Sequence, residues 1–129
     1  MAKEDFLIRL SLLEQQANQI EEQIVQVEQQ IQEMQVLSLN IGKLGKEKEK
    51  EILAPVGRGI FSKAELKEDK FFVNVGCGIF LKKNGDEASK IVNNQIEKLR
   101  QMKIELIEII SNINSELEKV VQEAQKEKS

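Results

Sequence analysis

The sequence contains no histidine, no tryptophan and no tyrosine, and only one cysteine and one proline among its 129 residues. The lack of histidine excludes imidazole acid–base catalysis and histidine-containing zinc sites. A lone cysteine cannot form a disulfide within the chain, which suits a reducing cytoplasm. Aromatic residues make up 4% of the chain and charged residues 32%. This composition indicates long charged helices with a narrow apolar seam.

Long apolar runs are missing as well. None approaches the roughly 20 residues that a membrane helix requires, and charges interrupt the first ten residues, where a signal peptide would have its apolar core. The net charge of −3 disfavours a nucleic acid as the main partner. We therefore expect a cytoplasmic protein that binds neither membranes nor nucleic acid. We also expect no enzyme activity, metal or cofactor, because the carboxylates lie on solvated helix faces without a convergent partner set.

Helix-breaking residues gather in the middle of the chain. All 7 glycines and the single proline lie within residues 42–85, whereas 1–41 and 86–129 contain neither. This distribution predicts a helix, then strands and turns, then a second helix. The three parts carry net charges of −5, +4 and −2. We expect a single domain, with a coiled-coil helix over 1–45, a charged linker over 46–51, β-hairpins over 52–83 and a second coiled-coil helix over 84–129.

Both flanking segments carry apolar residues in alternating steps of three and four. The first seam consists of Phe6, Leu10, Leu13, Ala17, Ile20, Ile24, Val27, Ile31, Met34, Ser38 and Ile41. The second consists of Val92, Ile96, Leu99, Lys103, Leu106, Ile110, Ile113, Leu117, Val120 and Ala124. Such unbroken heptads favour a coiled coil over an ordinary amphipathic helix. Asn84 and Glu87 have the spacing of a capping box at the start of the second helix.

The two seams can be paired as an antiparallel hairpin, in which the residue numbers of facing partners have a constant sum. A sum of 130 joins every layer, from Phe6 with Ala124 to Ser38 with Val92, and gives an arm about 60 Å long. A displacement by one heptad stays open, because Gly42 and Gly45 leave the end of the first helix undefined. Lys103 is the only charged seam residue, and we expect it to reach towards Glu28 or Glu105.

The central segment contains an internal repeat. The motif Val-Gly-x-Gly-Ile-Phe occurs at 56–61 and again at 75–80, nineteen residues later. Neither copy has the ending or the third glycine of a nucleotide-binding loop, so bends or bulges in strands are favoured. Alternating apolar residues predict four short strands in two hairpins, with Cys77 as a small buried residue on the face of Val73 and Val75. So small a sheet exposes its edges, and we expect other subunits to complete it.

The order of these motifs resembles the α-class subunit of archaeal-type prefoldin. The resemblance rests on Leu-Ala-Pro-Val-Gly-Arg-Gly at 53–59, on Val-Asn-Val-Gly-Cys-Gly at 73–78, and on Asp-Glu-Ala at 86–88, where the second helix begins. The strand region, of about 30 residues, fits the two-hairpin α class rather than the one-hairpin β class. The motifs cover 53–88, and the architecture covers nearly the whole chain. The second helix ends soon after Ala124, without the acidic continuation that is common in the family.

The resemblance implies an α+β fold, with a long antiparallel helical hairpin and two central β-hairpins that form an oligomeric β-barrel body. It implies a hexamer of two α-class and four β-class subunits without ATPase activity. In such a hexamer the tips of the coiled coils hold unfolded clients and deliver them to a group II chaperonin. The chain is accordingly interpreted as an ATP-independent holdase subunit.

Two sets of residues are candidates for these roles. The expected client-binding tip consists of Phe6, Leu7, Ile8, Leu10, Leu12, Leu13, Leu117, Val120, Val121 and Ala124. The expected assembly surface consists of Ile60, Phe61, Leu66, Phe71, Val73, Val75, Cys77 and Ile79. Leu7, Ile8, Leu12 and Val121 lie outside the seams, where either client binding or packing against a neighbouring helix would account for them.

Two other classes of function are weighed against this interpretation. A structural coiled-coil adaptor would need the helical arms but no client-sensitive tips, so suppression of aggregation distinguishes it from a holdase. A helical-hairpin protein that binds nucleic acid would need basic stripes, which the charge of −5 on residues 1–41 disfavours.

Overall fold

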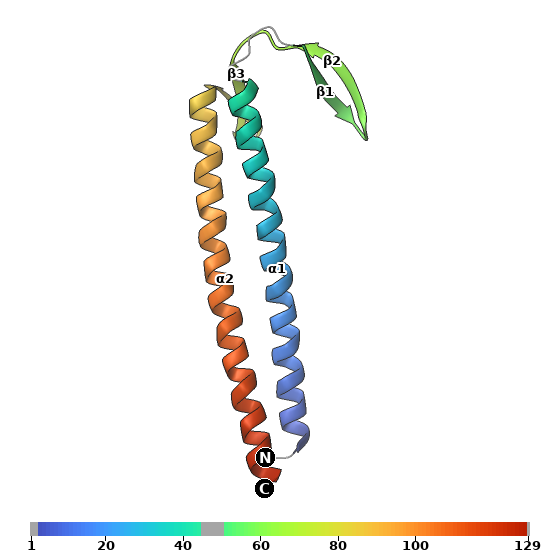
Figure 1. Ribbon diagram of the computed structural model, residues 1–129, viewed down its shortest axis with the longest axis vertical. Coiled ribbons are helices and arrows are strands. Elements are labelled where there is room, and N and C mark those ends of the chain that lie inside the picture. Colours follow the sequence, from blue (N-terminus) through green and yellow to red (C-terminus); the bar gives the residue numbers. More distant parts are fainter. Residues whose placement is uncertain (1–2, 45–50, 129) are drawn as a thin grey trace. The chain divides into compact units, whose positions relative to one another are not determined.

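A computed structural model describes residues 3–44 and 51–128 (Figure 1). Helix α1 (Lys3–Leu44) is followed by strands β1 (Glu51–Gly57), β2 (Ile60–Glu65), β3 (Lys70–Gly76) and β4 (Ile79–Asn84), and then by helix α2 (Gly85–Lys128). Two long helices with two antiparallel hairpins between them are the α+β fold that the sequence predicts. Residues 46–50 of the expected linker lie outside the described residues, and Glu51 begins β1.

The chain divides into two compact units. One contains residues up to 32 together with those from 97 onwards, and the other contains residues 33–96. In each unit α1 lies beside α2 in antiparallel orientation: Glu28 meets Lys103 in the first, and Ser38 meets Asn93 in the second. The described residues of the first unit are all helical, whereas the second unit contains both hairpins.

The burial of the helices confirms both predicted seams. Every predicted seam residue is buried or half-buried, whereas most residues between them are exposed. The fully covered positions include Phe6, Ala17 and Val27 in α1, and Leu106 and Val120 in α2. The helices therefore form through burial of one heptad stripe each, and not through a core that surrounds them.

Three contacts between side chains of the two helices fix the register. Arg9 and Glu123 approach to 3.4 Å, Glu28 and Lys103 to 3.1 Å, and Ser38 Oγ donates to the Asn93 amide oxygen at 3.4 Å. The residue numbers of these partners add up to 132, 131 and 131, close to the predicted 130. A displacement by one heptad would give sums near 123 or 137, so that alternative is wrong. Of the two partners expected for Lys103, the structure selects Glu28.

The two hairpins are structural copies of each other. Each strand of the second hairpin begins and ends nineteen residues after its counterpart in the first, which is the spacing of the sequence repeat. Strand pairing is antiparallel in both, and the register shifts at the same place, between Pro55 and Gly57 and between Asn74 and Gly76. The bulge expected near the glycines is therefore present in each hairpin.

The residues between the paired glycines form tight turns. Arg58 and Gly59 connect β1 to β2, and Cys77 and Gly78 connect β3 to β4, all four with positive φ. Positive φ at both central residues is typical of type I′ turns, whose twist matches that of the strands they join. Cys77 is consequently exposed at a hairpin tip, and its predicted burial is wrong. The alternation of apolar residues did not reveal that the chain reverses at this residue.

The capping box at the start of α2 is confirmed. The Glu87 backbone N–H donates to Asn84 Oδ1 at 2.8 Å, and the Asn84 N–H donates to the Glu87 carboxylate at 3.4 Å. These bonds satisfy backbone donors that would otherwise lack partners at the helix end. Because Asn84 also ends β4, the second hairpin runs into α2 without a connecting loop.

The register can be tested by a disulfide within one chain. Cysteines at Ile24 and Leu106, in a Cys77→Ser background, should form an intrachain disulfide under mild oxidation, because these residues face each other across the seam. Non-reducing electrophoresis of the monomer band detects the bond. A cysteine at Ile113 in place of Leu106 is the matched control, and stronger crosslinking of Ile24 to this position would contradict the register.

The turn at Cys77 can be tested by substitution at the tip. An L-residue in the left-handed region costs about 1–2 kcal/mol, and asparagine tolerates it best after glycine. We expect Cys77→Asn to slow amide hydrogen exchange in β3 and β4, and Cys77→Val to accelerate it. Equal exchange in the two variants would mean that the backbone at this position is not constrained in solution.

Candidate interaction surfaces

The hairpins expose large apolar side chains that the chain itself does not cover. Four positions recur in both copies at the nineteen-residue spacing: Leu53 with Phe72, Val56 with Val75, Ile60 with Ile79 and Phe61 with Phe80. All eight side chains are exposed, as is Leu81. Soluble monomers rarely leave so many large apolar residues uncovered in one region. The repeat therefore preserves a surface as well as a backbone.

Apolar residues occupy both faces of each hairpin. In the second, pairing of Phe71 with Lys83 and of Val73 with Leu81 places these apolar residues on one face, while Phe72 and Phe80 lie on the other. Lys82 Nζ lies 5.9 Å from the centre of the Phe72 ring, a cation–π contact on that second face. A hairpin with two apolar faces is not suited to rest on a single helix with its other face in water.

The predicted assembly residues are distributed unevenly over these surfaces. Ile60, Phe61, Val75 and Ile79 are exposed, and Phe71 and Val73 are half-buried. Leu66 lies beyond the end of β2, and Cys77 is at the turn. The prediction missed five exposed residues in the same hairpins. These are Leu53, Val56, Phe72, Phe80 and Leu81. Transferring Phe61 and Val75 to the other copy of the repeat would have identified two of them, Phe80 and Val56.

The predicted tip residues fall into two groups. The tip is formed by the N-terminal end of α1 and the C-terminal end of α2, which Figure 1 shows at the same end of the helix pair. The seam members are buried or half-buried between the helices, namely Phe6, Leu10, Leu13, Leu117, Val120 and Ala124. Leu7, Ile8, Leu12 and Val121 are exposed. Only this second group is available to another molecule while the helices stay paired.

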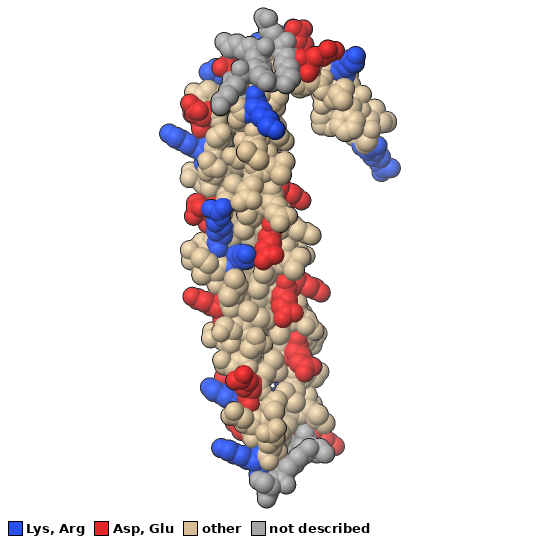
Figure 2. All heavy atoms as spheres, in the orientation of Figure 1, with Lys and Arg blue, Asp and Glu red and all other residues tan. Residues whose placement is uncertain are grey.

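Charges surround the apolar positions of the helices. Figure 2 shows acidic side chains along much of the length of the helices, with fewer basic ones between them. At the tip, Arg9 and Glu123 form an ion pair at 3.4 Å, with both side chains partly exposed. Such a pair contributes little to stability, on the order of 0–1 kcal/mol. The acidic surface has a different effect: its like charges repel a second copy of the chain and so disfavour association through the exposed apolar residues.

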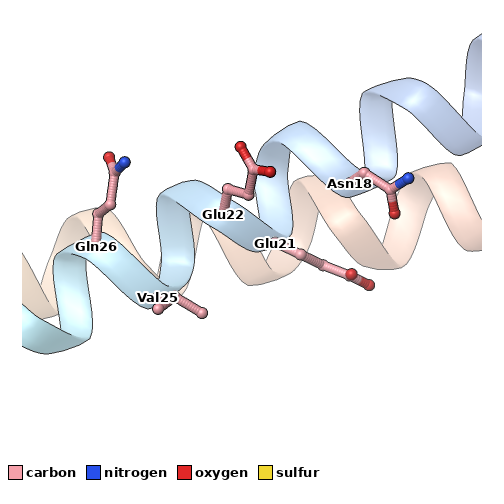
Figure 3. A pocket seen from close by; sticks show the side chains of 5 residues that line it. All are labelled: Asn18, Glu21, Glu22, Val25 and Gln26. Atoms are coloured by element: carbon pink, nitrogen blue, oxygen red, sulfur yellow. The ribbon is translucent and has the colours of Figure 1, made fainter.

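Side chains that could hold a metal ion are dispersed over the described residues. Within 3–44 and 51–128, no group of three or more cysteine and acidic residues is arranged to hold a metal ion, and no helix is long and apolar enough to cross a membrane. One surface depression lies over a single helix, lined by Asn18, Glu21, Glu22, Val25 and Gln26 of α1. Figure 3 shows these side chains projecting outward from the helix, without converging on a common point.

Comparisons with known proteins agree with the fold. A family model described as prefoldin subunit matches residues 13–128. The chain is 41% identical over 64 residues to the prefoldin subunit alpha of Thermofilum pendens, covering 49% of this chain and 48% of that protein. It is 29% identical over 127 residues to the prefoldin subunit alpha of Methanobrevibacter smithii, covering 92% and 87%. The names of both relatives agree with the α class expected from the two hairpins.

A solved structure shares the arrangement of elements. A chain of the filamentous PFD from Methanocaldococcus jannaschii, determined by cryo-EM, aligns with a TM-score of 0.58 and 21% identity. The alignment covers 93% of this chain and 95% of that one. At this level of identity the similarity supports the fold alone.

Proposed function

Because the chain belongs to the prefoldin family, we propose that it is an ATP-independent holdase subunit that captures unfolded proteins in the cytoplasm. The observation that carries this proposal is the exposed apolar group at the tip, which the helix seam does not use. The whole of residues 1–129 acts as one prefoldin-like domain, in which the hairpins assemble the oligomer and the tip contacts clients. Captured proteins pass to a group II chaperonin.

Assembly follows from what the hairpins lack. A two-stranded hairpin is marginally stable alone, and its outer edges present unpaired backbone groups. Pairing with hairpins of other subunits satisfies those edges and covers both apolar faces in one step. A closed barrel is the arrangement that leaves no edge. We propose that two chains of this kind and four β-class subunits build such a body, with the assembly surface extended to Leu53, Phe72 and Phe80.

The assembly surface can be tested by placing a charge within it. Phe61→Asp and Phe80→Asp should each abolish the hexamer formed with a β-class subunit, because burial of an unpaired carboxylate costs several kcal/mol. Native mass spectrometry measures the assembly, and circular dichroism should show the helices retained. Asn94→Asp, which adds the same charge on the exposed surface of α2, is the control. A full hexamer formed by the double variant with both Phe61→Asp and Phe80→Asp would show that this surface takes no part in assembly.

Client capture follows from the chemistry of the tip. Leu7, Ile8, Leu12 and Val121 offer branched apolar side chains on helix ends, where local opening costs least. Fully burying one such side chain contributes about 1.5–3 kcal/mol, and partial burial contributes less. Because association itself costs about 4–15 kcal/mol, one tip binds weakly and without sequence-specific pockets. Several tips on one body would add through multivalency. Weak, multiple contacts are suited to holding many different unfolded chains and releasing them without ATP.

The tip can be tested by removing its exposed apolar groups together. Changing Leu7, Ile8, Leu12 and Val121 to serine should reduce suppression of aggregation of an unfolded protein at least several-fold, with native mass and thermal unfolding nearly unchanged. Light scattering during dilution of the denatured protein measures capture. The control changes four exposed polar residues to serine, namely Gln15, Gln16, Gln19 and Gln122. Undiminished capture by the apolar variant would mean that these four side chains are dispensable, and that clients are held by the β-class arms or the inner cavity instead.

A further inference from the structure

The middle of the helix pair carries exposed apolar residues that neither the seam nor the tip accounts for. In α2, Met102, Ile104, Ile107 and Ile109 are each between 43% and 51% exposed, and Val25 of α1 is 53% exposed. They all lie in the helical unit, and none belongs to the hairpins. A helix that is apolar around its circumference normally has something packed against it. The distribution of these residues over the two sides of the seam indicates which kind of molecule packs against them.

The register assigns each residue beside the seam to one of two flanks. The Leu7 flank contains Leu7, Glu14, Glu21 and Glu28 of α1, with Arg100, Ile107, Asn114 and Val121 of α2. The Arg9 flank contains Arg9, Gln16, Gln23 and Gln30 of α1, with Met102, Ile109, Glu116 and Glu123 of α2. The ion pair of Arg9 with Glu123 joins the helices along the second flank. The ion pair of Lys103 with Glu28 joins a seam residue of α2 to the Leu7 flank.

Two apolar sites share the Leu7 flank. One is at the tip and consists of Leu7 and Val121. The other, the midway site, consists of Ile107 together with Val25 and Ile104. Val25 and Ile104 lie beside this flank on the side away from the seam, each three or four residues along its helix from a flank residue. Figure 3 shows Val25 projecting to the same side of α1 as Glu21. Ile107 and Val121 are two heptads apart, or about 21 Å at 1.5 Å per residue. An extended chain spans that distance with about six residues.

The surface between the two sites is acidic. Glu14 and Glu21 lie there, and no ion pair joins either of them to another residue of the described chain. The neighbouring cations are already engaged, since Arg100 lies 3.0 Å from Glu97 and Lys103 lies 3.1 Å from Glu28. An occupant with Lys or Arg at its centre would complement this surface. A second copy of the same flank would instead place carboxylates against carboxylates, and repulsion disfavours it.

We propose that the Leu7 flank is a two-site groove for extended segments of unfolded protein, with an apolar residue at each end and Lys or Arg between them. The groove deepens the proposed holdase function, on which it rests, by assigning a binding path along one flank and a preference for basic segments. The tip alone offers two apolar contacts on this flank, and the midway site adds three. The Arg9 flank also exposes Met102 and Ile109, but its α1 side consists of neutral glutamines. Its carboxylates, Glu116 and Glu123, are paired with Lys119 and Arg9, so this flank has no free acidic surface between apolar ends and stays unoccupied.

The test measures binding of defined peptides to the full-length chain by fluorescence anisotropy. The probe carries Phe-Leu at both ends and six central residues, three of them Lys. A second peptide replaces those Lys with Glu, and a third has only two central residues. We expect the Lys peptide to bind roughly tenfold more tightly than either of the others. Glu14→Gln combined with Glu21→Gln should abolish the preference for Lys over Glu, because it removes the facing carboxylates.

Two matched variants locate the site. Ile104→Ser with Ile107→Ser should weaken binding of the Lys peptide roughly tenfold. Met102→Ser with Ile109→Ser, which removes side chains of similar exposure from the opposite flank, should change it less than twofold. Circular dichroism and native mass should be the same for both. Equal weakening by the two variants, or no preference for Lys over Glu, would overturn the groove.

The result also separates the groove from the holdase function. If the peptide is lost from the tip variant but binds the Ile104 and Ile107 variant normally, the groove is wrong and capture at the tip stands. If neither variant changes binding of the peptide or suppression of aggregation, both proposals fall.

Discussion

The heptad seam between α1 and α2 is the interaction on which the rest of the chain depends. Each helix buries one stripe against the other and has little other cover, so the stripe must be continuous and correctly registered. Polar contacts along the seam hold the register without adding much energy. Lys103, the one cation within the stripe, reaches out to Glu28, and Ser38 meets Asn93. In another register Lys103 would lose its contact with Glu28.

A seam of this kind leaves most of the surface of each helix exposed, and this has consequences for function. Apolar residues that are not needed for the seam become available for binding, whether at the tip or on a flank. The hairpins likewise leave apolar side chains exposed. Because each has only two strands, neither can enclose Phe61 or Phe80 within the chain. The protein thus exposes apolar side chains on both its helices and its hairpins, with different partners proposed for each.

The hairpins show how one sequence repeat serves two levels of structure. The glycines at 57, 59, 76 and 78 adopt positive φ and permit bulges and tight turns in the same places. The equal offset of every strand then repeats the outward positions of Leu53 and Phe72, and of Phe61 and Phe80. The second copy differs in one useful respect. Its last residue, Asn84, also caps α2, so this hairpin is joined directly to the helical arm.

The sequence by itself determined the features that depend on neighbouring residues or on strict periodicity. Heptad spacing was enough for both seams and for a candidate pairing between them, and the Asn84–Glu87 spacing was enough for the cap. The exposure of Cys77 was not predicted, because the period-two alternation of apolar residues continues across its turn just as it would along a single strand. Only the tertiary structure decided which partner Lys103 takes and which heptad register holds. Both depend on side chains brought together from distant parts of the chain, and the spacing within one helix carries no information about which heptad of the other helix lies opposite.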